Sequence, residues 1–317
     1  MKKIFFYIIA IIAVSFTISI MLTKNVETNE VSTEEVEKVE NNFIKLLHTE
    51  TGSVEEIGLE SYLYGVVAAE MPASYELEAL KAQAVVARTY TKYKQNEKKH
   101  EQADICDDSK CCQAWISKEN RFARWEEDER ESNWQKIVSA VDSTAGKYII
   151  YEGQPINALF HSNSAGKTEL PINVWGGNYP YLESVETSGE EAYSTYASEV
   201  QISKDELIQK MLEKYPEFTI DFKKDDCMKI LEYNESGRVK TLKVGNINLS
   251  GVEARTIFGL KSTNFEFLID GDKIKFSILG YGHGVGLSQS GSDSLAKQGK
   301  NFEEIIKHYY KNVEIVE

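Results

Sequence analysis

The segment LESYLYGVVAAEMPASYELEALKAQAVVARTY (residues 59–90) predicts two helices separated by a break at Met71-Pro72. In the first helix, apolar side chains recur at spacings of three and four residues, which places them on one face. These side chains are Leu59, Tyr62, Leu63, Val66 and Val67. Glu70 continues the same spacing, so the pattern puts an acid on the helix face that should be buried.

This position predicts unusual acid–base behaviour for Glu70. Loss of water favours a protonated carboxyl, so burial should raise the pKa of the Glu70 side chain. Enzymes use raised carboxyl pKa values to keep a proton available near neutral pH. The alternative is that Glu70 ends its helix and pairs with a basic side chain.

The second helix is predicted to begin after Ser74, whose hydroxyl suits an N-cap. Leu77 and Leu80 begin a buried stripe that continues to Arg88. An inward-facing Arg88 near an inward-facing Glu70 suggests a pair in a cleft, where Arg88 stabilises the carboxylate or binds a carboxylate of the substrate. The alternative is a structural ion pair.

Composition indicates a globular protein and limits its partners. Of the 317 residues, 42% are hydrophobic and 11% aromatic, enough for a packed core. The formal net charge of −14 argues against a nonspecific nucleic-acid binder, because such proteins present basic surfaces. An acidic polymer substrate would need a local basic patch.

The N-terminus predicts a membrane anchor. Residues 4–22 are nineteen uncharged residues, long enough to cross a bilayer as a helix. Lys2 and Lys3 favour a cytoplasmic N-terminus (residues 1–3), with the rest of the chain outside. Residues 23–42 are rich in acids and predict a tether, followed by an extracytoplasmic domain at residues 43–317. The alternative is a cleaved signal peptide, although no clear cleavage motif follows.

The domain is predicted to be α+β, because strands and helices mix without the alternation of a doubly wound sheet. Apolar runs bounded by glycine turns predict strands at residues 43–47, 148–151, 156–160 and 274–279. Amphipathic patterns predict helices at residues 203–215 and 301–311.

A cysteine cluster predicts a zinc site. His100, Cys106, Cys111 and Cys112 give the pattern H-x5-C-x4-C-C. Three thiolates and an imidazole suit tetrahedral Zn²⁺, and four protein ligands make such a site structural. A disulfide of Cys106 is the alternative, since disulfides form readily outside the membrane. The remaining cysteine, Cys227, is predicted to be a buried free thiol.

Two polar loops are candidate walls of a binding cleft. They are FHSNSAGKTE (residues 160–169) and GYGHGVGLSQSG (residues 280–291), whose five glycines let the backbone approach a ligand closely. Their candidate contact residues are Ser162, Ser164, His283, Ser288 and Gln289. Aromatic rings in VWGGNYPYLESVE (residues 174–186) suit a carbohydrate. The alternative is that Trp175, Tyr179 and Tyr181 are core residues.

Several segments together resemble the sporulation stage II protein D family of peptidoglycan lytic transglycosylases. They are ESYLYGVVAAEMPASYELEALKAQAVVARTY, HSNSAGKTE with VWGGNYPYLESV, SGVEARTIFGLKSTNFEF, and GYGHGVGLSQSG followed by HYYKNVEI. These segments follow the order of the family and extend from about residue 58 to the C-terminus. Two departures are Ala165, where the family usually has a second glycine, and Tyr281, where tryptophan is common.

The resemblance implies cleavage of the β-1,4 bond between N-acetylmuramic acid and N-acetylglucosamine. The muramic C6 hydroxyl closes onto C1 and leaves a 1,6-anhydro end. Glu70, in the AEMP motif, is then both the general acid for the leaving oxygen and the general base for the C6 hydroxyl. This chemistry needs no cofactor, so a zinc ion would be structural. The implied substrate is glycan freed of its stem peptides, whose lactyl carboxylates Arg88 could bind.

The resemblance also implies partners and a location. The partners are peptidoglycan glycan strands, a cell-wall amidase and a membrane protein that together drive engulfment of the forespore during sporulation. The location is the mother-cell membrane facing the forespore. Motif position makes the candidate substrate-binding residues Arg88, Ser162, Ser164, His283, Ser288 and Gln289.

Two other functions fit parts of the sequence. A zinc-dependent cell-wall amidase would use His161, His283 and an acid such as Glu169 as ligands, although their spacing does not favour it. A noncatalytic scaffold would bind glycan or partner proteins at the membrane, and would keep its activity after Glu70→Gln.

Overall fold

Two helices formed by residues 59–97 lie in the larger core of the protein. The computed structural model describes residues 43–317. Helix α3 (Leu59–Glu70) ends at Glu70, and helix α4 (Leu77–Glu97) follows after a turn that contains Pro72. This confirms the predicted break at Met71-Pro72.

The start of α4 corrects the predicted N-cap. The cap residue is Glu76, not Ser74, and its side chain makes no capping hydrogen bond. Instead the Glu76 N–H donates to Asp293 Oδ1 across 2.5 Å. A distant carboxylate therefore stabilises the positive end of α4 and ties it to the C-terminal part of the chain.

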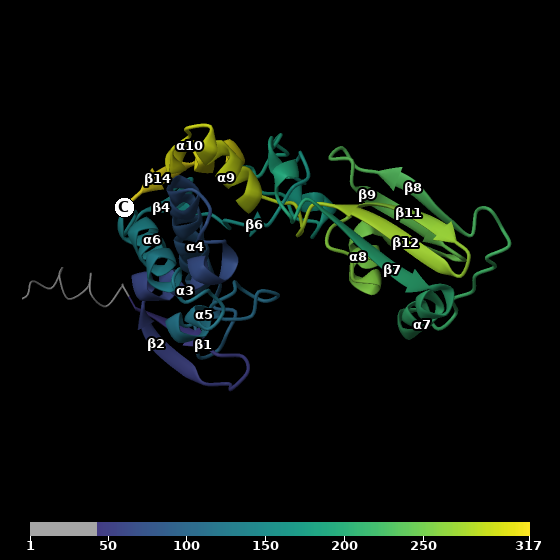
Figure 1. The fold of residues 1–317 in the computed structure, drawn as a ribbon, viewed down its shortest axis with the longest axis horizontal. Coiled ribbons are helices and arrows are strands. Elements are labelled where there is room, and N and C mark those ends of the chain that lie inside the picture. The colour runs from purple at the N-terminus through teal and green to yellow at the C-terminus, as the bar shows by residue number, and fades with distance from the viewer. Residues whose placement is uncertain (1–42) are drawn as a thin grey trace, which may run out of the picture. The chain divides into compact units, whose positions relative to one another are not determined.

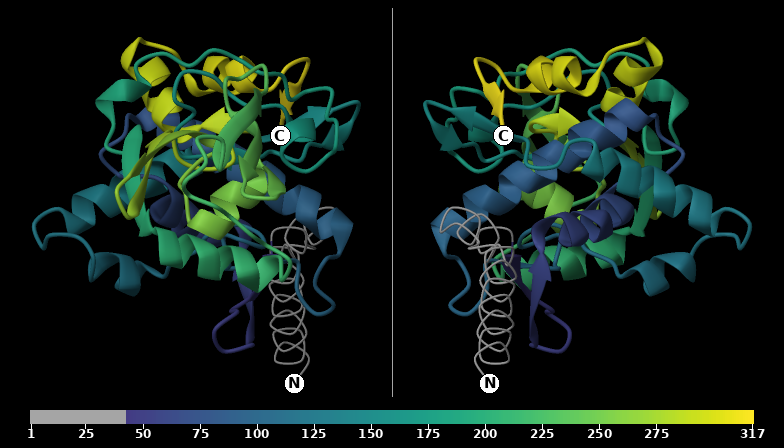
Figure 2. Two further views of the ribbon diagram at one scale, coloured as in Figure 1. Left: turned by 90° about the vertical axis from the view of Figure 1, so that its right-hand side faces the viewer. Right: turned by 90° about the vertical axis from the view of Figure 1, so that its left-hand side faces the viewer.

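Helices from both ends of the described chain pack around α4. They are α3, α6 (Arg130–Asp142), α9 (Gln289–Lys297) and α10 (Phe302–Tyr309). The yellow C-terminal helices lie beside the blue α4 (Figures 1 and 2). Because α4 is covered on several sides, nearly every residue from Ala79 to Thr91 is buried.

Short strands complete this larger core. One sheet has the order β2 (Val54–Gly58), β1 (Phe43–Leu47), β3 (Ile105–Cys106). Another has the order β14 (Glu314–Val316), β4 (Tyr148–Tyr151), β5 (Gln154–Pro155). The short helix α5 (Lys118–Phe122) contacts α3, and two 3₁₀ turns, η1 (Pro171–Asn173) and η2 (Glu190–Ala192), lie in later loops.

A second core forms from two antiparallel sheets and two helices. One sheet has the order β11 (Asn264–Asp270), β12 (Lys273–Leu279), β7 (Ala197–Ser203). The other has the order β10 (Ile247–Ser250), β9 (Val239–Val244), β8 (Met228–Tyr233). Helices α7 (Lys204–Lys214) and α8 (Gly251–Phe258) pack against these strands. Along β12, Ile274, Phe276 and Ile278 are buried and alternate with exposed neighbours, as strand geometry requires.

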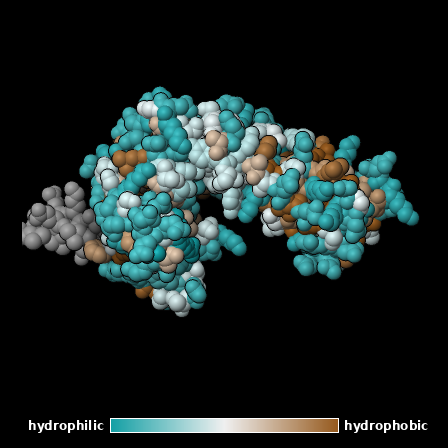
Figure 3. Space-filling model, viewed as in Figure 1, coloured by the Kyte–Doolittle hydropathy of each residue, from teal (hydrophilic) through white to brown (hydrophobic). Residues whose placement is uncertain are grey.

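Figure 3 shows mainly hydrophilic atoms over the helices and hydrophobic patches over the strands of the second core. Large exposed apolar side chains of these strands include Leu231, Tyr233 and Leu268. The sheets therefore present apolar atoms outward as well as to their core.

Most predicted elements are confirmed to within one or two residues. Strands 43–47, 148–151 and 274–279 are β1, β4 and β12, and helices 203–215 and 301–311 are α7 and α10. The strand predicted at 156–160 is wrong, because only Phe160 belongs to a strand, β6 (Phe160–His161). Ile156 is buried as its apolar character requires, but the next N–H, of Asn157, bonds the Tyr181 hydroxyl instead of a neighbouring strand.

The small sheets and surrounding helices agree with the predicted α+β class. Residues Ile44–Glu317 form one compact unit. The segments predicted at residues 1–3, 4–22 and 23–42 lie outside the described residues. Within residues 43–317, no helix has both the length and the apolar character needed to span a membrane.

Candidate active site

The two polar loops of the sequence lie side by side. Strand β6 pairs in parallel with β13 (Leu287–Ser288), and an isolated antiparallel bridge joins Asn163 to Tyr281. Segments more than a hundred residues apart in the chain thus form one wall.

Glycines make this close approach possible. A Cβ on Gly286 would lie 2.0 Å from the Leu159 carbonyl oxygen, and one on Gly282 would lie 2.8 Å from the His161 Cβ. Both glycines also have positive φ, +73° and +114°. The glycine-rich sequence is therefore required by packing and by backbone conformation.

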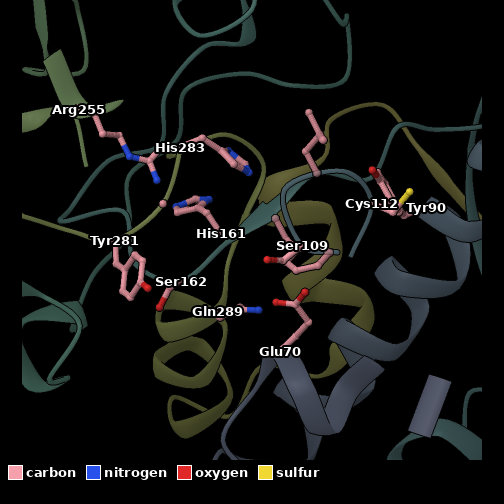
Figure 4. A pocket seen from close by; sticks show the side chains of 13 residues that line it. Glu70, Tyr90, Ser109, Cys112, His161, Ser162, Arg255, Tyr281, His283 and Gln289 are labelled. Carbon is pink, nitrogen blue, oxygen red and sulfur yellow. The ribbon is translucent and has the colours of Figure 1, made fainter. Parts of the chain in front are cut away.

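A cavity of about 390 Å³ opens between these loops and the end of α3 (Figure 4). Glu70 comes from α3, Gln289 from α9 and Arg255 from α8. The other lining residues are Tyr90, Ser109, Cys112, Leu159, Phe160, His161, Ser162, Tyr281, Gly282 and His283. Four sequence candidates, Glu70, Ser162, His283 and Gln289, therefore line one cavity.

Glu70 is the only acid in this lining among the described residues. Its Oε1 accepts a hydrogen bond of 2.7 Å from the Ala114 N–H. Burial raises the pKa of the Glu70 carboxyl, while the Ala114 N–H and the Gln289 amide oppose that rise. Glu70 does end its helix, but within residues 43–317 it has no basic partner. The predicted direction of the pKa shift is confirmed.

The side-chain amide of Gln289 is directed at the same carboxyl. The residue is 5% exposed, and its Nε2 has no hydrogen-bond partner at normal distance within residues 43–317. In Figure 4 this nitrogen points toward the Glu70 carboxyl. A buried amide donor without a partner costs free energy, so an acceptor on a ligand here would be favoured.

Arg88 lies outside this cavity, which corrects its predicted place beside Glu70. Its guanidinium is fully buried and pairs with Glu60, with Nε 2.9 Å from Oε1 and a second bond from Nη2 to Oε2. Nη1 donates to the Lys147 carbonyl across 3.0 Å. Glu60 begins α3 whereas Glu70 ends it, so Arg88 faces the opposite end of that helix. Arg88 therefore forms a structural ion pair, which was the alternative left open by the sequence.

His161 and His283 lie together in the cavity wall, with ring centroids 5.6 Å apart. Burial lowers the pKa of His161 to about 3, and desolvation lowers the pKa of His283 well below its ordinary value. His161 Nδ1 lies 3.1 Å from the Val285 carbonyl, so it carries the proton, and Nε2 accepts from the Ser164 hydroxyl at 2.8 Å. His283 Nδ1 accepts from the Val285 N–H at 3.1 Å. Both imidazoles are therefore neutral near pH 7.

The geometry gives the amidase hypothesis no support. Both His161 nitrogens are engaged, and Glu169 does not line the cavity. The Glu169 carboxylate is buried and accepts from Asn173, Asn234 and Ser236. Within residues 43–317, one group of His, Cys, Asp or Glu side chains has metal-binding geometry, and it is the cysteine cluster.

Ser164 and Ser288 also lie outside the lining, contrary to their predicted contact with substrate. Both donate hydrogen bonds to the buried carboxylate of Glu190, Ser164 from its backbone N–H at 3.0 Å and Ser288 from its hydroxyl. Glu190 also accepts from the Gly166 N–H at 2.9 Å and the Thr187 hydroxyl at 2.5 Å. The two serines therefore hold the loops together instead of facing the cavity.

The four predicted zinc ligands converge. One ligand atom from each of His100, Cys106, Cys111 and Cys112 lies within 4.8 Å of the others. The Cys111 and Cys112 sulfurs are 3.9 Å apart, and Cys112 Sγ is 3.3 Å from His100 Nε2. Zinc–sulfur bonds of about 2.3 Å put the corners of a tetrahedron about 4 Å apart, so these residues fit zinc. All four cysteines are free thiols, including the buried Cys227, as predicted for that residue.

This cluster adjoins the cavity. Cys112 lines it, and Ala114, two residues later, donates to Glu70. Gln113 between them is buried and donates to the Tyr62 hydroxyl at 2.9 Å and to Thr91 Oγ1 at 3.0 Å. The segment that carries the cysteines therefore positions the donor on Glu70.

Comparison with known proteins identifies the family. Residues 48–151 match the SpoIID family model, described as Stage II sporulation protein. Stage II sporulation protein D of Bacillus amyloliquefaciens is 35% identical over 277 residues, which cover 86% of this chain and 78% of that protein. The chain belongs to the stage II sporulation protein D family. The protein of that name from Bacillus subtilis is also 35% identical, over 86% of this chain and 79% of the relative. The amidase enhancer of Bacillus subtilis is 29% identical over 78% of this chain and 39% of that protein.

The stage II sporulation protein match at residues 48–151 contains Glu70 and the whole cysteine cluster. Arg255, Tyr90 and Ser109 line the cavity but were missed in the sequence. The available signal for Arg255 was its place in SGVEARTIFGLKSTNFEF, a segment that resembles the family. For Tyr90 and Ser109, no pattern of spacing or charge in the sequence indicated that they line a cavity.

The aromatic residues of segment 174–186 divide between the two predicted roles. Trp175 is 54% exposed and meets the His283 ring edge-on, with centroids 4.9 Å apart. Tyr181 is buried, and its hydroxyl accepts from the Asn157 N–H at 2.9 Å. Trp175 therefore remains available to a ligand, whereas Tyr181 is a core residue.

Ala165, where the family usually has glycine, has a φ of 56°. This left-handed conformation costs a residue with a side chain about 1–2 kcal/mol. We expect Ala165→Gly to stabilise the protein by about 0.5–1 kcal/mol, after subtracting the greater freedom of glycine in the unfolded chain. Thermal unfolding should show a Tm higher by about 1–4 °C.

Ala123→Gly is the matched control. Ala123 is exposed and has a right-handed φ of −61°. Glycine there should destabilise by about 0.4–1 kcal/mol. Equal destabilisation by both substitutions would contradict the strain assigned to Ala165.

Proposed function

We propose that this protein is a membrane-anchored lytic transglycosylase. It would cleave the β-1,4 bond between MurNAc and GlcNAc in peptide-free peptidoglycan strands and leave 1,6-anhydroMurNAc ends. The observation that carries this proposal is Glu70, a buried carboxyl with a raised pKa and the only acid lining the cavity in residues 43–317. Ordinary glycosidases use two carboxyl groups at a defined separation. A reaction in which the C6 hydroxyl of the substrate replaces water needs one.

Glu70 performs both proton transfers in this proposal. Burial raises the pKa of its carboxyl and favours the protonated form, which gives its proton to the leaving glycosidic oxygen. The resulting carboxylate accepts the proton of the C6 hydroxyl as that oxygen attacks C1. The Ala114 N–H occupies Oε1, which leaves Oε2 for the substrate. The neutral His161 and His283 have no proton acidic enough to compete.

A structural zinc ion is part of the same proposal. His100, Cys106, Cys111 and Cys112 would supply the Cys₃His ligand set of structural sites, whose closed coordination leaves no water for chemistry. The bound ion would fix segment 100–112, and these residues in turn hold Ala114 against Glu70.

Location and partners follow from the resemblance to the family. Residues 4–22 would anchor the protein in the mother-cell membrane, with the N-terminus cytoplasmic and the domain facing the forespore. A cell-wall amidase would supply peptide-free strands, and a membrane protein would complete the engulfment complex during sporulation. One relative is named an amidase enhancer, which agrees with an amidase as partner.

The chemistry of the new chain ends tests the proposal. Peptide-free glycan is digested with the full-length protein in detergent, or with its Glu70→Gln variant, and the ends are identified by mass spectrometry. We expect anhydro ends, each lighter by one water than a reducing end, from the wild type alone. Reducing ends would indicate a hydrolase. Release of stem peptides that stops on chelation would indicate an amidase, and no cleavage at all would favour a scaffold.

A further inference from the structure

The buried arginines Arg88 and Arg238 both have partners. Arg88 pairs with Glu60. Arg238 is 1% exposed and donates to the Ser164 and Lys167 carbonyls at 2.7 and 2.9 Å. Arg255 differs, because its side chain forms no hydrogen bond and no ion pair within residues 43–317 although it lines the cavity.

The surroundings of Arg255 leave its charge uncompensated. Figure 4 shows its guanidinium directed toward His161 and His283, and both imidazoles are neutral. Glu70 is the one acid of the lining among the described residues, and it forms no ion pair with Arg255. Arg255 is partly buried, and burial lowers the pKa of its guanidinium, which has lost part of its water without gaining a carboxylate. A desolvated, unpaired cation favours an anionic ligand.

The amide of Gln289 lies in the same lining with its nitrogen directed toward Glu70 (Figure 4), so it does not neutralise the charge of Arg255.

We propose that Arg255 binds the lactyl carboxylate of a peptide-free muramoyl residue and thereby selects strands whose stem peptides have been removed. This inference rests on the proposed function, which supplies the muramoyl sugar. A planar guanidinium matches a carboxylate with two parallel hydrogen bonds. In a peptide-bearing strand the lactyl carboxyl group is converted to an amide. It then has no charge and leaves the guanidinium unpaired.

The test separates recognition from cleavage. Muramoyl oligosaccharides with free lactyl carboxylates, and the same oligosaccharides with those groups converted to N-methylamides, are titrated into the full-length Glu70→Gln protein in detergent. We expect the free form to bind about ten- to hundredfold tighter, the range for a hydrogen bond to a charged group. Adding Arg255→Gln should reduce binding of the free form to that of the amide and leave the amide unchanged. Adding Arg255→Lys should restore part of the preference.

Arg124→Gln is the matched control, since it removes the same charge from an exposed position and should change neither affinity. Equal loss of both ligands in Arg255→Gln would show a structural role and overturn the inference. If Arg255 causes a preference for the free carboxylate but the wild type forms no anhydro products, the proposed function is wrong and the role of Arg255 in binding stands. If the wild type forms anhydro products but binds the free carboxylate and the amide equally, the proposed function stands and the role of Arg255 is wrong.

Discussion

Replacing Glu70 by Gln is expected to lower the rate of glycan cleavage by about 10²–10⁴-fold, the usual contribution of a general acid or base. The amide keeps the shape of the side chain but can neither give a proton to the glycosidic oxygen nor accept one from the C6 hydroxyl. Oε1 can still accept from the Ala114 N–H, so the fold should be retained. The measurement is the initial rate of anhydro-end formation from peptide-free glycan.

Glu119→Gln makes the same atomic change on an exposed residue of α5 and should leave the rate unchanged. A Glu70→Gln variant with full activity would contradict the catalytic role. Loss of activity in both variants would point to a general effect on the preparation.

The raised pKa of Glu70 gives this substitution a second signature, in stability. The pKa of Glu70 is higher in the folded protein than in the unfolded chain, so between these two pKa values the folded protein binds more protons. Stability of the wild type therefore falls as pH rises from the ordinary glutamate pKa through the raised one. Glu70→Gln should be more stable than the wild type at neutral and alkaline pH, with the difference vanishing below the ordinary pKa. Thermal unfolding at a series of pH values measures this, and the wild-type rate should fall over the same rise in pH.

Removal of zinc is expected to have the other large effect. A chelator, or Cys106→Ser, should destabilise the protein by at least about 3 kcal/mol and lower the Tm by about 6–12 °C. This is less than the 10–16 kcal/mol typical of zinc-finger peptides, because the larger core persists without the ion. Cleavage should also slow, since Ala114 follows the cluster and donates to Glu70. Metal analysis of the protein as purified should give one zinc per chain.

Cys227→Ser is the matched control for the cluster. Cys227 is a buried free thiol outside the four predicted ligands, so its loss should leave the zinc content and the response to chelator intact. A disulfide of Cys106 found by mass spectrometry without reduction, together with indifference to chelator, would contradict the zinc site.

Short-range patterns predicted the helices well because those patterns report burial directly. The spacing from Leu59 to Glu70 predicted both the helix and the buried acid at its end. The cysteine cluster was equally local, since its four ligands lie within thirteen residues of the chain. The strand at 156–160 was wrong because Asn157, inside the segment, donates its N–H to the Tyr181 hydroxyl, which interrupts strand pairing between Ile156 and Phe160.

Partners at long range could not be predicted from spacing. An inward Arg88 was expected, but whether it met Glu60 or Glu70 depended on which end of α3 it faces. Ser164 and Ser288 were correctly placed in adjacent loops, yet the buried Glu190 that engages both is far from each in the sequence. Arg255 reaches the cavity only because the second core brings α8 to its edge.

Because loops 160–169 and 280–291 lie side by side in the cavity wall, the cavity can form only after both loops have been synthesised. Glu70 is made more than two hundred residues before Gln289 and helices α9 and α10, which pack on α4. A chain interrupted before residue 280 lacks one wall of the cavity and exposes apolar residues of α4. A growing chain that has not reached residue 280 therefore carries Glu70 without the cavity around it, and under the proposed function it could not cleave glycan.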